Sequence, residues 1–224
     1  MSRTAAKPPV PPEFPEEPAG FPLTALEHDQ EIREAELSEC DLSGQRARGV
    51  SFTASRLEAV DLSGSDLDHL RIASAHLRSC NLANLRVRSG HLSRVQIESS
   101  RLTGIALAGG DLSDLRLRGC RIDLASFGSA RLERVVFEDC QLSQTDFLEA
   151  RLDSVCFTDC DLTGADFRGA RLGRCEFRRC RIAELQGVES LRGAAFEWPA
   201  IVEFAGTWAQ ALGIRVLHED EPAS

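Results

Sequence analysis

Hydrophobic residues recur every five positions along most of this chain. Between Ile32 and Ile182, every position whose number ends in 2 or 7 holds Leu, Ile, Val or Phe, except Ala47. No insertion interrupts this register. A helix repeats at about 3.6 residues and a strand at about 2, so neither fits a period of five. The pattern instead predicts a coil in which each five-residue unit forms one short edge.

A second series of inward positions lies two residues before the first. Positions ending in 0 or 5 are mostly small or of moderate size, as at Ala35, Cys40 and Val50, whereas Gln45 and Thr145 are more polar members. The other three positions of each unit are mainly Asp, Arg, Glu, Ser, Gly and Thr. Each unit therefore places one large and one small side chain inside, and three in water.

A period of twenty residues is superimposed on the period of five. One series of phenylalanines repeats at twenty, and a second series is offset from it by ten. Four units thus make one turn, equivalent residues stack above one another, and the two series lie on opposite walls of a square-sectioned solenoid. The first series is Phe127, Phe147 and Phe167, the second is Phe137, Phe157 and Phe177, and cysteines at multiples of twenty are Cys40, Cys80, Cys120, Cys140, Cys160 and Cys180.

Several units resemble the repeat of the pentapeptide-repeat family. They are "CDLSG" (40–44), "VDLSG" (60–64), "CDLTG" (160–164) and "ADFRG" (165–169). The resemblance covers residues 32–185. It implies an all-β fold, a right-handed quadrilateral β-helix of seven to eight coils. A short C-terminal helical cap is expected to follow it.

Composition divides the chain into three parts. Residues 1–25 are predicted to be a disordered proline-rich N-terminal tail, because residues 1–22 hold seven of the nine prolines and should be disordered or extended. Residues 26–186 form the pentapeptide-repeat β-helix. Residues 187–224 are predicted to be a helix and strand that serve as cap or dimerisation segment, with an acidic tail.

The C-terminal part carries apolar residues at helical spacing. Pro199 is suited to the start of a helix and Gly213 to its end. One interpretation is a cap over the last turn, and the other is a homodimer contact made partly by the same face. Pentapeptide-repeat proteins that act on DNA gyrase look similar in this segment. The candidate cap or dimer residues are Trp198, Ile201, Phe204, Trp208 and Leu212.

The formal net charge is −9, so direct nucleic-acid binding is not expected. Along the coil the charges form rings: −4 over residues 33–70, +6 over 71–121, −7 over 122–166 and +4 over 167–185. These rings suit solvation and ion pairs between turns, or alternatively docking to a protein partner of opposite charge. Stacked on one wall, the candidate partner-facing residues are Arg131, Arg151 and Arg171.

No residue pattern indicates catalysis, and no cofactor or metal site is predicted. The eight cysteines contain no CxxC pair, and all but Cys156 occupy the small inward position. The five histidines lack metal-ligand spacing, and the carboxylates lie on flat walls. Residues 1–20 have none of the apolar run of a signal peptide, and no stretch is apolar enough to span a bilayer. A non-enzymatic, cytoplasmic protein without membrane contact is therefore expected.

The family resemblance implies a DNA-mimicking modulator or protector of DNA gyrase or another type II topoisomerase, associated with resistance to quinolones or other topoisomerase poisons. The ring of charge +6 over residues 71–121 opposes this hypothesis, because a duplex mimic needs negative potential along its length. The alternative is a general protein-interaction scaffold with an unrelated partner.

Overall fold

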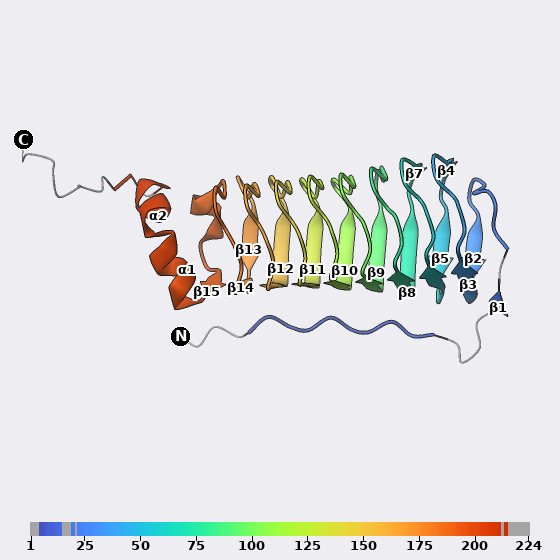
Figure 1. Ribbon diagram of the computed structural model, residues 1–224, viewed down its shortest axis with the longest axis horizontal. Helices are drawn as coiled ribbons and strands as arrows, with labels where there is room; N and C mark the ends of the chain where they lie inside the picture. Colours follow the sequence, from blue (N-terminus) through green and yellow to red (C-terminus); the bar gives the residue numbers. More distant parts are fainter. Residues whose placement is uncertain (1–4, 15–18, 21, 212, 215–224) are drawn as a thin grey trace, which may run out of the picture.

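The computed structural model describes residues 5–14, 19–20, 22–211 and 213–214. The chain is a parallel β-solenoid of about 8 turns with a short C-terminal helical part, which confirms the predicted fold class (Figure 1). Its elements are β1 (Ala19–Gly20), β2 (Glu31–Arg33), β3 (Ala35–Ser38), β4 (Arg46–Arg48), β5 (Ser51–Thr53), β6 (Arg56–Glu58), β7 (Asp66–Asp68), β8 (Arg71–Arg78), β9 (His91–Glu98), β10 (Asp111–Arg118), β11 (Arg131–Glu138), β12 (Arg151–Thr158), β13 (Arg171–Gly173), β14 (Glu176–Arg178), the 3₁₀-helix η1 (Val188–Leu191), β15 (Ala195–Phe196), α1 (Trp198–Glu203) and α2 (Ala205–Ala211).

Neighbouring turns pair in parallel with a shift of one twenty-residue turn. Leu132 lies opposite Leu152, and Phe137 lies opposite Phe157. The same register continues through bridges outside the strands, such as Asp41 opposite Asp61. Identical positions of successive turns therefore form columns along the rod.

Two adjacent walls of the coil are strands, and the other two are mostly turns with single bridges. The long strands β8 to β12 each bend across two walls. We call the wall formed by their first halves, with β13, the arginine wall. The wall formed by their second halves, with β6 and β14, is called the arm wall.

Each corner of the coil uses a residue in the left-handed backbone region. Every position ending in 4 or 9 from Asp29 to Glu184 has a positive φ, between +49° and +74°. Most of these residues are not glycine, which alone adopts this region without strain. The corner N–H donates to a carbonyl of the next turn, as Glu34 does to Thr53 at 2.9 Å. These bonds between turns hold the chain in its five-residue period.

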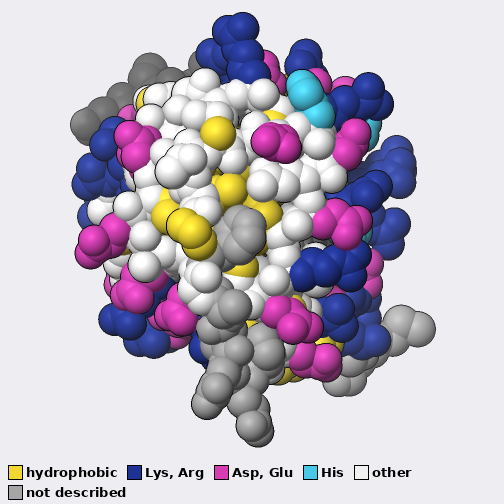
Figure 2. Space-filling view, turned by 90° about the vertical axis from the view of Figure 1, so that its right-hand side faces the viewer, with side chains coloured by type: hydrophobic (Ala, Val, Ile, Leu, Met, Phe, Trp, Pro, Cys, Tyr) yellow, Lys and Arg dark blue, Asp and Glu magenta, His cyan; other side chains and the backbone are white. Residues whose placement is uncertain are grey.

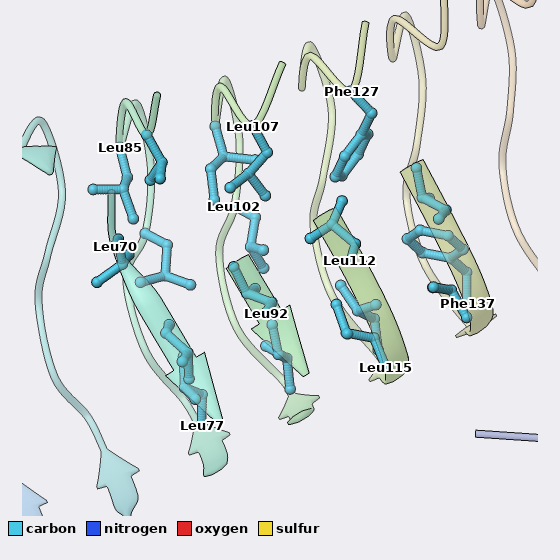
Figure 3. Close-up of a pocket in the computed structure, with 18 residues that line it drawn as sticks. Leu70, Leu77, Leu85, Leu92, Leu102, Leu107, Leu112, Leu115, Phe127 and Phe137 are labelled. Carbon is cyan, nitrogen blue, oxygen red and sulfur yellow. The ribbon is translucent and has the colours of Figure 1, made fainter. Parts of the chain in front are cut away.

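The core is filled by phenylalanine in one half of the coil and by leucine in the other. Phe137 and Phe157 stack with ring centroids 5.0 Å apart, and Phe157 meets Phe147 edge-on at 6.0 Å. In the leucine half, an enclosed apolar cavity of about 30 Å³ lies between side chains that include Leu102 and Leu107 (Figure 3).

The small inward series links neighbouring turns by hydrogen bonds. The Cys120 thiol donates to the carbonyls of Arg118 and Ile97, the latter on the preceding turn. Ser100 donates to the Glu98 carbonyl and accepts the N–H of Cys80 at 3.0 Å. Cysteine and serine in this series therefore satisfy backbone groups as well as filling the corners.

At the N-terminal end of the coil, apolar side chains gather near the centre, surrounded by backbone and charged residues (Figure 2). Leu23 and Leu26 are buried there, and β1 pairs with β3. Residues 5–14 contain no helix or strand and lie as an extended segment beside the coil (Figure 1). This segment, which we call the arm, runs along the rod from the C-terminal end toward β1 (Figure 1).

Candidate interaction surfaces

The C-terminal cap continues the aromatic stack of the core. Phe196 on β15 stacks on Phe177 with ring centroids 4.5 Å apart. Trp208 on α2 then covers Phe196 edge-on at 5.1 Å. Pro199 lies in the first turn of α1, and Gly213 has a φ of +73°, as its predicted place at the helix end requires.

The structure divides the predicted cap residues between two faces. Ile201, Phe204 and Trp208 are half-buried, and the last two pack against the end of the core. Trp198 is 75% exposed and Val202 is 59% exposed, so α1 turns these two side chains to solvent. Leu212 lies outside the described residues. The helical periodicity placed Ile201, Phe204, Trp208 and Leu212 on one apolar face, and it gave no orientation for Trp198.

The arginine wall brings Arg131, Arg151 and Arg171 into register, since each pairs with the next across β11, β12 and β13. All three are exposed and border a shallow groove that also includes Gly169 and Glu149. Arg131 forms an ion pair with Glu133 at 3.1 Å. Within the described part of the chain, Arg151 and Arg171 have no ion pair. Like charges stacked at about 4.8 Å repel one another, and an anionic group placed beside the column would relieve this repulsion.

Many other charges are neutralised between turns. The pairs Arg88–Asp68, Arg134–Asp114 and Arg179–Asp159 join residues twenty positions apart, with N–O distances of 2.6, 2.7 and 2.6 Å. The hydrogen bond from Arg179 lowers the pKa of Asp159 below its usual value. Opposite charges twenty residues apart in the sequence predict these ion pairs. The net charge of each ring does not show them.

The Arg134–Asp114 pair is the least exposed of these ion pairs. Both guanidinium nitrogens Nε and Nη2 donate to the two carboxylate oxygens, and Arg134 also contacts Glu133. Asp114 is only 9% exposed, and the hydrogen bond from Arg134 lowers its pKa. This carboxylate therefore stays charged at neutral pH although it is buried.

Two thiols of the core, those of Cys80 and Cys175, are held in their neutral form. Burial raises the pKa of Cys80, and it raises the pKa of Cys175 to about 12. Cys156, the one outward cysteine, is half-buried beside Thr158. In residues 5–14, 19–20, 22–211 and 213–214, no group of three or more His, Cys, Asp or Glu side chains is placed to hold a metal ion. The described helices are all too short or too polar to cross a membrane.

Several solved structures are similar to this chain. HetL from the cyanobacterium Nostoc sp., a pentapeptide repeat protein involved in heterocyst differentiation regulation, is 19% identical over 76% of this chain and 88% of its own, with a TM-score of 0.46. QnrB1, a plasmid-mediated fluoroquinolone resistance protein, is 19% identical over 87% of this chain and 98% of its own, with a TM-score of 0.38. No curated protein sequence gives a significant match.

Two family matches agree with the register of the coil. "Pentapeptide repeats (8 copies)" matches residues 35–70, and "Pentapeptide repeat region" matches residues 119–186. The same five-residue units form every described turn between these two segments, with the same pairing from turn to turn. Residues 35–70 and 119–186 are therefore pentapeptide repeats, and the coil between them continues their register.

Proposed function

We propose that this protein is a non-enzymatic rod that acts by binding another protein along its flat walls. The column of Arg131, Arg151 and Arg171 carries this proposal. Its guanidinium groups are exposed and in register, and two of them have no ion pair among the described residues. A partner with a row of carboxylates would neutralise this column and gain electrostatic complementarity.

Replacing Arg151 and Arg171 by Glu tests the proposal. Affinity capture from cells with the wild-type chain should recover one partner, and the double variant should recover at least tenfold less of it. Arg101→Glu is the matched control, because Arg101 is exposed on a different wall and has no ion pair within the described residues. Equal recovery by all three chains would exclude the arginine wall as the docking surface.

A more specific candidate is a DNA-mimicking modulator or protector of DNA gyrase or another type II topoisomerase. The family resemblance and the net charge of −9 support it, and the ring of charge +6 opposes it. Gyrase supercoiling assays with and without a fluoroquinolone test this candidate. Inhibition of supercoiling, or protection from the drug, at micromolar protein would support it. No effect in either assay would exclude this candidate. The remaining hypothesis would then be a protein-interaction scaffold with an unrelated partner.

A dimer would support the topoisomerase candidate. We propose the exposed face of α1 as the contact between its two subunits. Trp198 and Val202 lie four residues apart, on one face of the helix. Light scattering should report a dimer for the wild-type chain and a monomer for Trp198→Asp. Leu148→Asp is the matched control, because Leu148 is 41% exposed but lies on the coil. A Trp198→Asp chain that stays dimeric would place the contact elsewhere.

A further inference from the structure

The arm is anchored to the coil at three points. The N–H of Ala6 donates to Glu176 at 3.2 Å, and the N–H of Val10 donates to Asp114 at 3.0 Å. The guanidinium carbon of Arg56 lies 5.1 Å from the centre of the Phe14 ring. These anchors lie near the C-terminal end, the middle and the N-terminal end of the rod, so the arm follows almost its whole length (Figure 1).

The spacing of the anchors matches the pitch of the coil. Ala6, Val10 and Phe14 are four residues apart, and four residues of extended chain reach about 13–14 Å. Their partners on the coil are separated by about three turns, which is about 14 Å at the spacing between paired strands. The length of four arm residues equals that of about three turns both between Ala6 and Val10 and between Val10 and Phe14. The repeat along the arm therefore matches the repeat along the wall.

The residues between the anchors suit this extended form. Two prolines precede Val10 and two follow it, and proline has no backbone N–H that would need a partner. Ala6, Pro9, Pro12 and Phe14 are half-buried, with more exposed residues between them. Proline-rich segments favour the extended polyproline II conformation, which is semi-rigid before it binds.

The wall beneath the arm contains polar groups that are unusually buried for an outer surface. Asp114 accepts the Val10 N–H while Arg134 holds its carboxylate in place. Ser154 lies in the same column two turns further on, in the interval between the Asp114 and Glu176 anchors. It is 1% exposed, and its hydroxyl has no hydrogen-bond partner. The arm thus leaves unused a buried hydroxyl that a different segment could engage.

We propose that the arm wall is a recognition site for extended, proline-rich peptide segments, and that residues 5–14 occupy it as a displaceable ligand built into the chain. The partner segment presents backbone N–H groups four residues apart, prolines between them, and an aromatic ring for Arg56. Because the arm covers this wall, a partner binds there only by displacing it. This inference goes beyond the proposed function and does not depend on which protein meets the arginine wall.

The proposal is tested with a fluorescent peptide of residues 5–14 added to the full chain. In the wild-type chain the attached arm competes at high effective concentration, so the peptide should bind weakly. The double variant Val10→Pro, Phe14→Ala keeps an extended arm but loses two of the three anchors. By fluorescence anisotropy it should bind the peptide at least tenfold more tightly than the wild-type chain does.

Glu13→Pro is the matched control, because it adds a proline at an exposed position where no hydrogen bond is lost. It should bind the peptide as weakly as the wild-type chain. A peptide that itself carries Val10→Pro should bind the double variant at least fivefold more weakly. Circular dichroism of each chain checks that the coil is intact.

Three results would overturn the proposal, two from the comparison of chains and one from a further substitution. One is failure of the peptide to bind the folded double variant at millimolar concentration. Another is equal binding to the wild-type chain and the double variant. Arg56→Ala, introduced into the double variant, should weaken peptide binding severalfold, whereas Arg101→Ala on another wall should not. Equal loss from both substitutions would show non-specific binding and would also overturn the proposal.

Discussion

The two halves of the coil share one backbone and one register, yet they fill their interiors differently. In the C-terminal half, two columns of phenylalanine alternate across the section, with stacked centroids 4.5–5.4 Å apart. In the middle of the rod, leucine, isoleucine and valine take the same positions and leave a cavity of about 30 Å³. The backbone therefore sets the pitch, and the side chains decide how well the section is filled.

Where the two halves meet, the two inward positions of a unit compensate for each other in size. Ile105 and Leu107 lie one turn before Ala125 and Phe127, in the same columns. In this pair of turns a large residue at the second position accompanies leucine and a small one accompanies phenylalanine, whereas elsewhere Ser100 accompanies Leu102 and Val135 accompanies Phe137. The total volume stays near what the section holds, as packing in protein interiors requires.

The largest expected effect comes from a charge placed in the phenylalanine half. Phe157→Arg should give insoluble protein, because Phe157 is fully buried between stacked rings and no acidic partner is available inside. The fraction of soluble protein after expression measures this. Thr158→Arg, on the outer wall of the same turn, should remain soluble. A soluble Phe157→Arg chain with unchanged circular dichroism would contradict the assigned interior.

Deletion of a large core side chain should distinguish the two halves. Phe157→Ala should lower the free energy of unfolding by about 4 kcal/mol, because it opens a new cavity in a filled section. Leu102→Ala should lower it by about 2–3 kcal/mol, because Leu102 already borders a cavity and loses fewer contacts. Urea denaturation measures both. An equal loss would indicate that the cavity does not weaken packing in the leucine half.

Conversion of one leucine turn to the phenylalanine type tests the compensation directly. Ile105→Ala alone should lower the free energy of unfolding by about 2–4 kcal/mol. Adding Leu107→Phe should place a ring in the column of Phe127 and bring stability back to within about 1 kcal/mol of wild type. A double-mutant cycle in urea measures the coupling. Additive effects would mean that the two positions are chosen independently.

The smallest expected effect concerns a corner at the boundary between the halves. Leu124 has a φ of +59° and a side chain that is 59% exposed. Leu124→Gly should raise the free energy of unfolding by about 0.5 kcal/mol, because relief of left-handed strain exceeds the added entropy of the unfolded chain. A small increase in Tm measures it. Gly104→Ala should lower Tm, since its Cβ would lie 2.5 Å from Asn84 Oδ1.

The five- and twenty-residue periods of the sequence predicted how the side chains of the coil stack. Phe157 over Phe137, and Arg151 over Arg131, follow from a register that no insertion interrupts. The left-handed corners were missed, because residues as different as Leu124 and Ser154 occupy them and composition carries no clear signal. Here hydrogen bonding between turns overrides local preference.

The arm and the cap depended on tertiary contacts that periodicity does not encode. The prolines predicted an extended or disordered tail, but the bond from Val10 to Asp114 joins residues 104 positions apart. In the cap, the apolar spacing did not show that Trp198 turns outward while Trp208 covers Phe196. Both features are set by the shape of the finished coil.

Columns in strict register restrict how this protein can change its length during evolution. A duplication of twenty residues would add one complete turn to the coil. Every aromatic ring and every ion pair would still face an equivalent neighbour. A duplication of five would rotate all later side chains by one wall and separate the phenylalanine columns. Every four residues of the arm span about three turns of the coil. Three added turns would therefore require about four more residues in the arm.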